Sequence, residues 1–105
     1  MTAAEPITVV GAGSWGTALA ATLARRGAPT TLWAREAEVA RGIESSRRNP
    51  LFLSDVELPA GLRATDDLAA ALDGARIVLS VVPTQFVRGV FAGRADALAA
   101  ADIVA

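Results

Sequence analysis

The feature that most constrains this chain is an apolar, β-branched run that ends directly in a glycine-rich turn. Residues 7–10 read ITVV and residues 11–16 read GAGSWG. A continuous β-branched run is typical of a strand that is buried on both faces. The next residues, 14–26, carry apolar side chains near helical spacing. A strand, a tight turn and a helix in this order predict the start of a βαβ unit with parallel strands.

The rest of the chain continues this alternation of strand and helix. Thr65 or Asp66 is expected to cap the third helix, and residues 49–61, which contain two prolines, predict a long connection. Further strands are expected at 30–34, 62–65, 76–82 and from 102 onward, and further helices at 36–46, 66–72 and 84–100. The pattern predicts an α/β fold with a Rossmann-like, doubly wound parallel sheet. We expect residues 1–105 to be an N-terminal domain, the front portion of a longer protein, because the last run has strand composition.

The turn matches G-x-G-x-x-G in a context that gives each glycine a task. It follows a strand, opens a helix and leads into a second strand, as in dinucleotide-binding folds. Gly11 permits the tight turn, Gly13 lets the backbone approach a pyrophosphate, and Gly16 allows the helix to pack close to the strand. The free amides and the dipole of the helix N-terminus would bind the diphosphate. The alternative is that the glycines serve only a tight strand-to-helix turn.

The end of the second strand predicts which dinucleotide is bound. An acidic residue about 20 residues past the loop holds the ribose hydroxyls of NAD, whereas an arginine accommodates the 2′-phosphate of NADP. Arg35 stands at this position, and its planar guanidinium suits phosphate. The sequence therefore favours NADPH, while NADH stays an alternative because Glu36 is adjacent. An ordinary solvated charge at a helix start is the other interpretation of Arg35.

A third candidate element lies where the run 76–82 leads into PTQF. Open α/β sheets bind ligands at the carboxyl ends of their strands. Pro83 would stop this strand and present apolar bulk to the cofactor, and Phe86 would lie one turn into the next helix. A plain strand-to-helix turn with a core phenylalanine is the other interpretation. The carboxylates show no paired spacing that predicts a metal site or an acid–base site.

Composition and charge exclude several classes of function. A net charge of −1 without long runs of like charge argues against nucleic-acid binding and an anionic-membrane patch. The first apolar stretch is too short for a signal peptide or a membrane span. The absence of cysteine fits a cytoplasmic protein. Lysine, histidine and tyrosine are also absent, so we expect no catalytic residue in this chain and a proton-transfer group elsewhere. The pairs Arg25–Arg26 and Arg47–Arg48 are expected to be solvated charges at helix ends.

Four stretches together resemble the N-terminal domain of bacterial-type NAD(P)-dependent sn-glycerol-3-phosphate dehydrogenases. They are GAGSWGTALA, TLWAR, NPLFL and VVPTQFVR, and the resemblance runs from residue 7 to residue 105. It implies reversible reduction of dihydroxyacetone phosphate to sn-glycerol 3-phosphate for glycerophospholipid synthesis. It also implies a helical C-terminal domain with the catalytic lysine, and a substrate-binding lysine after the last strand, both absent from this chain. The chain alone would then bind a dinucleotide at best.

The resemblance also implies roles for individual residues. The loop at Ser14 and Trp15 would contact the cofactor, and Arg35 would lie by the adenosine 2′-phosphate. Phe86 would pack near the bound dinucleotide. Phe52 stands where the family often has tyrosine, and the resemblance makes it a cofactor contact as well.

Alternatives to this resemblance stay open on the residues alone. The chain could be the dinucleotide domain of a 3-hydroxyacid or 6-phosphogluconate dehydrogenase, or a non-catalytic dinucleotide-binding module. A homodimer is one alternative for the oligomeric state. Within the cleft, we expect the indole of Trp15 to pack beside the strand that ends at Pro83, with its backbone amide near phosphate.

Overall fold

The computed structural model describes residues 5–82, 84–93 and 102–104, and it confirms the predicted alternation of strands and helices. The strands are β1 (Ile7–Val10), β2 (Thr30–Trp33), β3 (Leu62–Thr65), β4 (Ile77–Ser80) and β5 (Asp102–Val104). The helices are α1 (Ser14–Arg25), α2 (Ala37–Ser46), α3 (Leu68–Leu72) and α4 (Thr84–Phe91).

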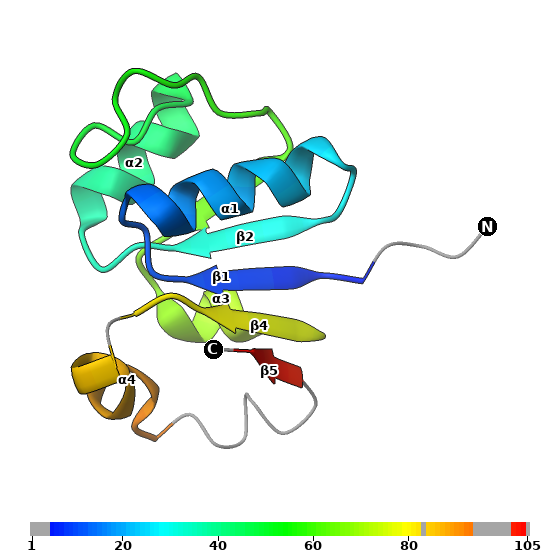
Figure 1. Cartoon of the computed structure of the whole chain (residues 1–105), viewed down its shortest axis with the longest axis vertical. Coiled ribbons are helices and arrows are strands. Elements are labelled where there is room, and N and C mark those ends of the chain that lie inside the picture. The colour runs from blue at the N-terminus through cyan, green and yellow to red at the C-terminus, as the bar shows by residue number, and fades with distance from the viewer. Residues whose placement is uncertain (1–4, 83, 94–101, 105) are drawn as a thin grey trace.

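The described strands lie parallel in one sheet with the order β3-β2-β1-β4-β5 (Figure 1). Val10, the last residue of β1, pairs with Trp33 of β2 on one side and with Ser80 of β4 on the other. The chain therefore adds β2 and β3 on one side of β1, and then returns to add β4 and β5 on the other side. This confirms the doubly wound α/β fold, and it creates a switch point between β1 and β4, where sheets of this type bind ligands.

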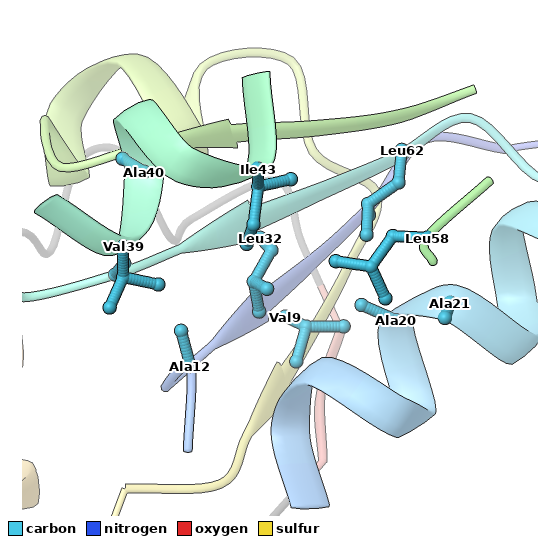
Figure 2. Close-up of a cluster of buried hydrophobic side chains, with 11 residues drawn as sticks. Val9, Ala12, Ala20, Ala21, Leu32, Val39, Ala40, Ile43, Leu58 and Leu62 are labelled. Atoms are coloured by element: carbon cyan, nitrogen blue, oxygen red, sulfur yellow. The ribbon is translucent and has the colours of Figure 1, made fainter. Parts of the chain in front are cut away.

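Helices cover both faces of the sheet, and each face has its own hydrophobic core. On one face Val9 packs in a cluster with Ala20 of α1 and Ile43 of α2 (Figure 2). On the other face Val10 packs in a cluster with Leu72 of α3. Successive residues of a strand point to opposite faces, so a strand between two cores is buried on both faces and its sequence is largely apolar. This explains the β-branched, largely apolar run at residues 7–10.

Most elements differ from the predicted bounds by one or two residues, and the start of α3 and the end of α4 differ in ways that matter for the structure. The N-cap of α3 is Asp67, whose carboxylate accepts a backbone amide of the first turn, rather than Thr65 or Asp66. Thr65 instead accepts the backbone amide of Asp67 through its hydroxyl, at 3.0 Å. The last predicted helix ends as α4 at Phe91, and residues 94–100 of its predicted range lie outside the described residues.

The connection between α2 and β3 is held by hydrogen bonds to its backbone. Arg47 has a left-handed φ of 59°, and its guanidinium donates to the carbonyl oxygens of Pro59 at 3.1 Å and Leu62 at 2.6 Å. The prediction that Arg47 is a solvated helix-end charge is therefore wrong. Leu58, in the same connection, is buried in the core shared by α1 and α2. The connection is thus an ordered part of the face that carries these two helices.

Candidate functional site

Two glycines between β1 and α1 are required by close packing. Gly11 has a φ of 119°, and a Cβ there would lie 3.1 Å from Cγ2 of Val81. A Cβ on Gly16 would overlap the carbonyl oxygen of Gly11 and lie 2.7 Å from Cγ2 of Val81. Because glycine has no Cβ, α1 can approach the ends of β1 and β4 this closely. These contacts agree with the turn and packing tasks that the sequence predicts for the two glycines.

The middle glycine differs, because nothing in the described fold requires it. Gly13 has a φ of −70°, and no described atom beyond its chain neighbours lies within 4 Å of the place of a Cβ. An alanine would fit there without backbone strain. Open space directly before the main chain fits a ligand that approaches the backbone closely, as a pyrophosphate does in such loops. Gly13 therefore favours ligand binding over the interpretation that all three glycines serve the turn.

The N-terminus of α1 supplies hydrogen-bond donors to this space. Gly13 is its N-cap and has no side chain that could bond to the first amides, and the first turn contains no acidic residue. The first amides of a helix have no acceptor within it, and the helix dipole favours negative charge at this end. The hydroxyl of Ser14 donates to the carbonyl oxygen of Phe52 at 2.8 Å, so it is already engaged. The main-chain amides are the groups that a phosphate would meet here.

A cavity of about 600 Å³ lies at the carboxyl edge of the sheet, and residues 11–16, Arg35, Phe52 and Phe86 help to line it. A neighbouring cavity of about 570 Å³ shares Arg35 and Phe86 and extends along Asp67. The two cavities form one cleft that crosses the switch point, with the glycine loop in one half and Arg35 where the halves meet. Cofactor sites combine apolar and aromatic walls with a few placed polar groups. This cleft has main-chain donors in one half, a guanidinium between the halves and aromatic side chains along its walls.

Three aromatic side chains at the cleft are exposed rather than packed. The exposed fractions are 71% for Trp15, 41% for Phe52 and 49% for Phe86. The expectation that the indole of Trp15 packs across the cleft is therefore wrong, because this residue lies on the side of α1 opposite the helix's buried face. Pro83, at which the strand beside that indole is expected to end, lies outside the described residues. Exposed apolar rings around a concave surface mark a site of binding.

Both candidate selector residues lie at the cleft. Arg35 follows β2, is exposed, and lines both cavities. Within the described parts of the chain, its guanidinium makes no ion pair. Glu36 lines the larger cavity and is the N-cap residue of α2, where its side chain makes no cap bond. The guanidinium is thus available to a phosphate and the carboxylate to ribose hydroxyls.

Asn49 is a residue of this site that sequence reasoning misses. Its side chain is fully buried, and its Nδ2 amide donates to the carbonyl oxygen of Ala12 and to the hydroxyl of Thr17, each at 2.9 Å. Its Oδ1 accepts the backbone amides of Leu51 at 3.2 Å and Phe52 at 3.1 Å. These bonds join the connection to the glycine loop and bring Phe52 to the cleft. The Asn-Pro pair signals a turn, but partners 37 positions away leave no mark in the sequence.

The described residues offer no cluster of three or more side chains that could hold a metal ion. None of the described helices has the length and apolar character that crossing a membrane requires.

Comparison with known proteins covers nearly all of the chain. Residues 6–105 match the model of a family described as NAD-dependent glycerol-3-phosphate dehydrogenase N-terminus. The chain is 57% identical over 86 residues to a glycerol-3-phosphate dehydrogenase (NAD(P)+) of Rhodospirillum rubrum, a match that covers 82% of this chain and 25% of that protein. It is 53% identical over 83 residues to the enzyme of the same name from Stenotrophomonas maltophilia, covering 79% of this chain and 24% of that protein.

A solved structure supports the same relationship. The crystal structure of glycerol-3-phosphate dehydrogenase from Coxiella burnetii matches with a TM-score of 0.72 at 40% identity, covering 79% of this chain and 26% of that one. The chain thus spans about a quarter of the length of the relatives that it matches.

The family match includes every part of the cleft, from the glycine loop through Arg35 and Asn49 to the end of β4. It favours this family over the 3-hydroxyacid and 6-phosphogluconate types that the residues alone leave open. The doubly wound sheet, the cleft at its switch point and the match over residues 6–105 lead to one conclusion: the chain belongs to the family of the N-terminal domain of NAD-dependent glycerol-3-phosphate dehydrogenases.

Proposed function

We propose that this chain is the cofactor-binding domain of an oxidoreductase that interconverts dihydroxyacetone phosphate and sn-glycerol 3-phosphate with NAD(P)H. The observation that carries the proposal is the open space before Gly13, beside the first amides of α1 in the switch-point cleft. The names of the relatives, glycerol-3-phosphate dehydrogenase (NAD(P)+), support the reaction. Its product would supply the backbone of glycerophospholipids.

In this proposal the chain binds and orients the cofactor, which supplies the hydride chemistry when it is bound. Gly13 leaves room for the diphosphate, and the amides of Ser14 and Trp15 in the first turn of α1 are proposed as donors to it. Phe52 and Phe86 form apolar walls of the cleft. Pro83, which lies outside the described residues, is proposed on sequence grounds as a further wall of the cleft.

Arg35 is proposed to bind the 2′-phosphate and so to favour NADPH over NADH. Its support is threefold: it follows β2, it lines both cavities, and it makes no ion pair within the described residues. An arginine–phosphate contact is charge-assisted and can be bidentate, and hydrogen bonds to charged groups contribute about 1.5–3 kcal/mol.

The chain is proposed to hold the cofactor without supplying the proton. Lysine, histidine, tyrosine and cysteine are absent from it, and these are the common donors at neutral pH apart from tuned carboxylates. Proton transfer to the substrate is therefore assigned to residues outside 1–105. A cytoplasmic location, which the absence of cysteine supports, and a homodimeric assembly complete the proposal.

The reaction is tested on the whole gene product that carries this chain. Oxidation of NADPH or NADH is followed by absorbance after dihydroxyacetone phosphate is added. The proposal expects consumption of at least one cofactor that depends on this substrate. Dinucleotide binding without oxidation would point instead to a non-catalytic module, and absence of both would refute the proposal.

The selector role of Arg35 is tested by calorimetry with NADPH and NADH. We expect Arg35→Ala to weaken NADPH binding by about 10- to 100-fold, as loss of a charge-assisted contact predicts, and to change NADH binding little. Arg41→Ala is the matched control, because Arg41 is an exposed arginine on α2 that does not line the cleft. Equal effects on both cofactors would show that Arg35 does not select between them.

A further inference from the structure

Asn49 is the most completely bonded polar side chain near the cleft. It is fully buried, and all of its hydrogen-bonding directions lead to parts of the site. The Nδ2 amide holds the glycine loop at the carbonyl of Ala12 and holds α1 at the hydroxyl of Thr17. The Oδ1 oxygen holds the amides of Leu51 and Phe52. One side chain thus links its own connection to the glycine loop and to α1, which lie 37 and 32 positions away in the sequence.

The bond to Ala12 sets the direction of the next amide. Ala12 and Gly13 share a peptide plane, in which the carbonyl and the N–H point in opposite directions. With the carbonyl held inward by Asn49, the N–H of Gly13 points outward, and Gly13 lines the cleft. The hydroxyl of Thr17 also donates to the carbonyl of Ala12, at 3.3 Å, so the plane is held from two sides.

The same side chain sets the position of the aromatic wall. Phe52 belongs to a connection without regular structure, closed by an antiparallel bridge between Asn49 and Leu53. Its amide is bound to Asn49, and its carbonyl oxygen accepts the hydroxyl of Ser14. Phe52 is therefore tied to the start of α1 directly at its carbonyl and, through Asn49, at its amide.

We propose that Asn49 is a positioning residue for the dinucleotide: it aims the Gly13 amide at the diphosphate and fixes the Phe52 wall in register with the glycine loop. This proposal rests on the proposed function, because it assumes that the cleft binds a dinucleotide. It assigns Asn49 no contact with the cofactor. The half of the cleft assigned to adenosine, which Arg35 and Asp67 help to line, contains no residue that is bonded to Asn49.

The test compares two ligands on the intact protein. NADPH needs both halves of the cleft, whereas adenosine 2′-monophosphate has no diphosphate and so does not need the half at the glycine loop. Asn49→Asp keeps an oxygen that accepts the amides of Leu51 and Phe52 but loses the donor to the Ala12 carbonyl. We expect it to weaken NADPH binding by at least about tenfold, the effect of one buried hydrogen bond left unmade, and to change binding of the monophosphate less than twofold.

One further variant, with two controls, keeps the proposal falsifiable if Asn49→Asp does not fold. Thr17→Val removes the second acceptor of the Nδ2 amide at similar volume, and it should also weaken NADPH binding more than monophosphate binding. Thr22→Val is its control, because the Thr22 hydroxyl bonds only within α1, to the carbonyl of Ala18. Arg48→Gln is the control for the connection between α2 and β3. Arg48 donates to the carbonyl oxygen of Ser54, and neither residue lines the cleft. Neither control should change NADPH binding.

Amide hydrogen exchange without cofactor tests the hydrogen bonds from Leu51 and Phe52 to Asn49. In Asn49→Ala the amides of Leu51 and Phe52 should exchange with solvent at least about tenfold faster than in the wild type. Unchanged exchange, or equal weakening of both ligands by Asn49→Asp and Thr17→Val, would overturn the positioning role. A wild type that binds neither NADPH nor NADH would overturn the proposed function, and with it the role of Asn49. Wild-type binding with unchanged NADPH affinity in Asn49→Asp would overturn the role of Asn49 alone.

Discussion

Gly16 and Gly13 of the loop should respond differently to the same substitution. Gly16→Ala places a Cβ into the carbonyl oxygen of Gly11 and 2.7 Å from Cγ2 of Val81, well inside the 3.4 Å where ordinary contact begins. Gly13→Ala places a Cβ into open space at a φ of −70°. We therefore expect the first change to act on stability and the second to act on cofactor binding.

The magnitudes follow from these contacts. Overpacking against a backbone atom that cannot rotate away costs about 3 kcal/mol, the upper part of the usual range. The better helix propensity of alanine offsets about 1 kcal/mol at Gly16. The free energy of unfolding should thus fall by about 2 kcal/mol. At Gly13 a poorer N-cap and a less flexible unfolded chain act in opposite directions, so the net change should stay within about 1 kcal/mol.

Urea denaturation followed by circular dichroism measures the stability of both variants, and calorimetry measures their affinity for NADPH and NADH. Gly13→Ala should keep near wild-type stability and lose at least about tenfold in dinucleotide affinity, because its Cβ takes the room of the diphosphate. If Gly13→Ala binds dinucleotides like the wild type, the open space is not the phosphate site. If Gly16→Ala is as stable as the wild type, α1 does not depend on the close approach described for this loop.

Two other substitutions test the packing around the site. Asp67→Ala removes the N-cap of α3 and should lower the free energy of unfolding by about 1 kcal/mol in urea denaturation, while Asp73→Ala, at the other end of α3, should have little effect. An equal loss in both variants would contradict the capping role. Gly42→Ala puts a Cβ 2.6 Å from Cδ of Pro50 and should destabilise the protein by about 1 kcal/mol in the same assay, after helix propensity is counted. Gly61→Ala, where nothing described lies within 4 Å, is the matched control, and equal stability of the two variants would contradict the predicted clash.

Much of the fold could be predicted from local pattern. The run 7–10 is β-branched throughout and apolar except at Thr8, because β1 lies between two cores, and this pattern can be recognised in the sequence alone. The spacing of Gly11, Gly13 and Gly16 predicts the turn and the start of α1, because the requirement for a missing Cβ acts within a few residues. The placement of Arg35 after the second strand follows from the same short-range order.

The sequence by itself thus determined the order of elements, the doubly wound sheet and the part of the cleft that its strand ends create. Only the tertiary structure decided the roles of Asn49, Arg47 and Trp15. Asn49 and Arg47 act through hydrogen bonds to distant backbone groups, and a polar side chain in a loop carries no periodic signal that names such partners. The side of α1 that packs on the sheet leaves Trp15 exposed, and that choice depends on how the helix is rotated against the strands. Local sequence preference decides where elements begin and end, whereas burial and hydrogen-bond satisfaction are settled only when the segments meet.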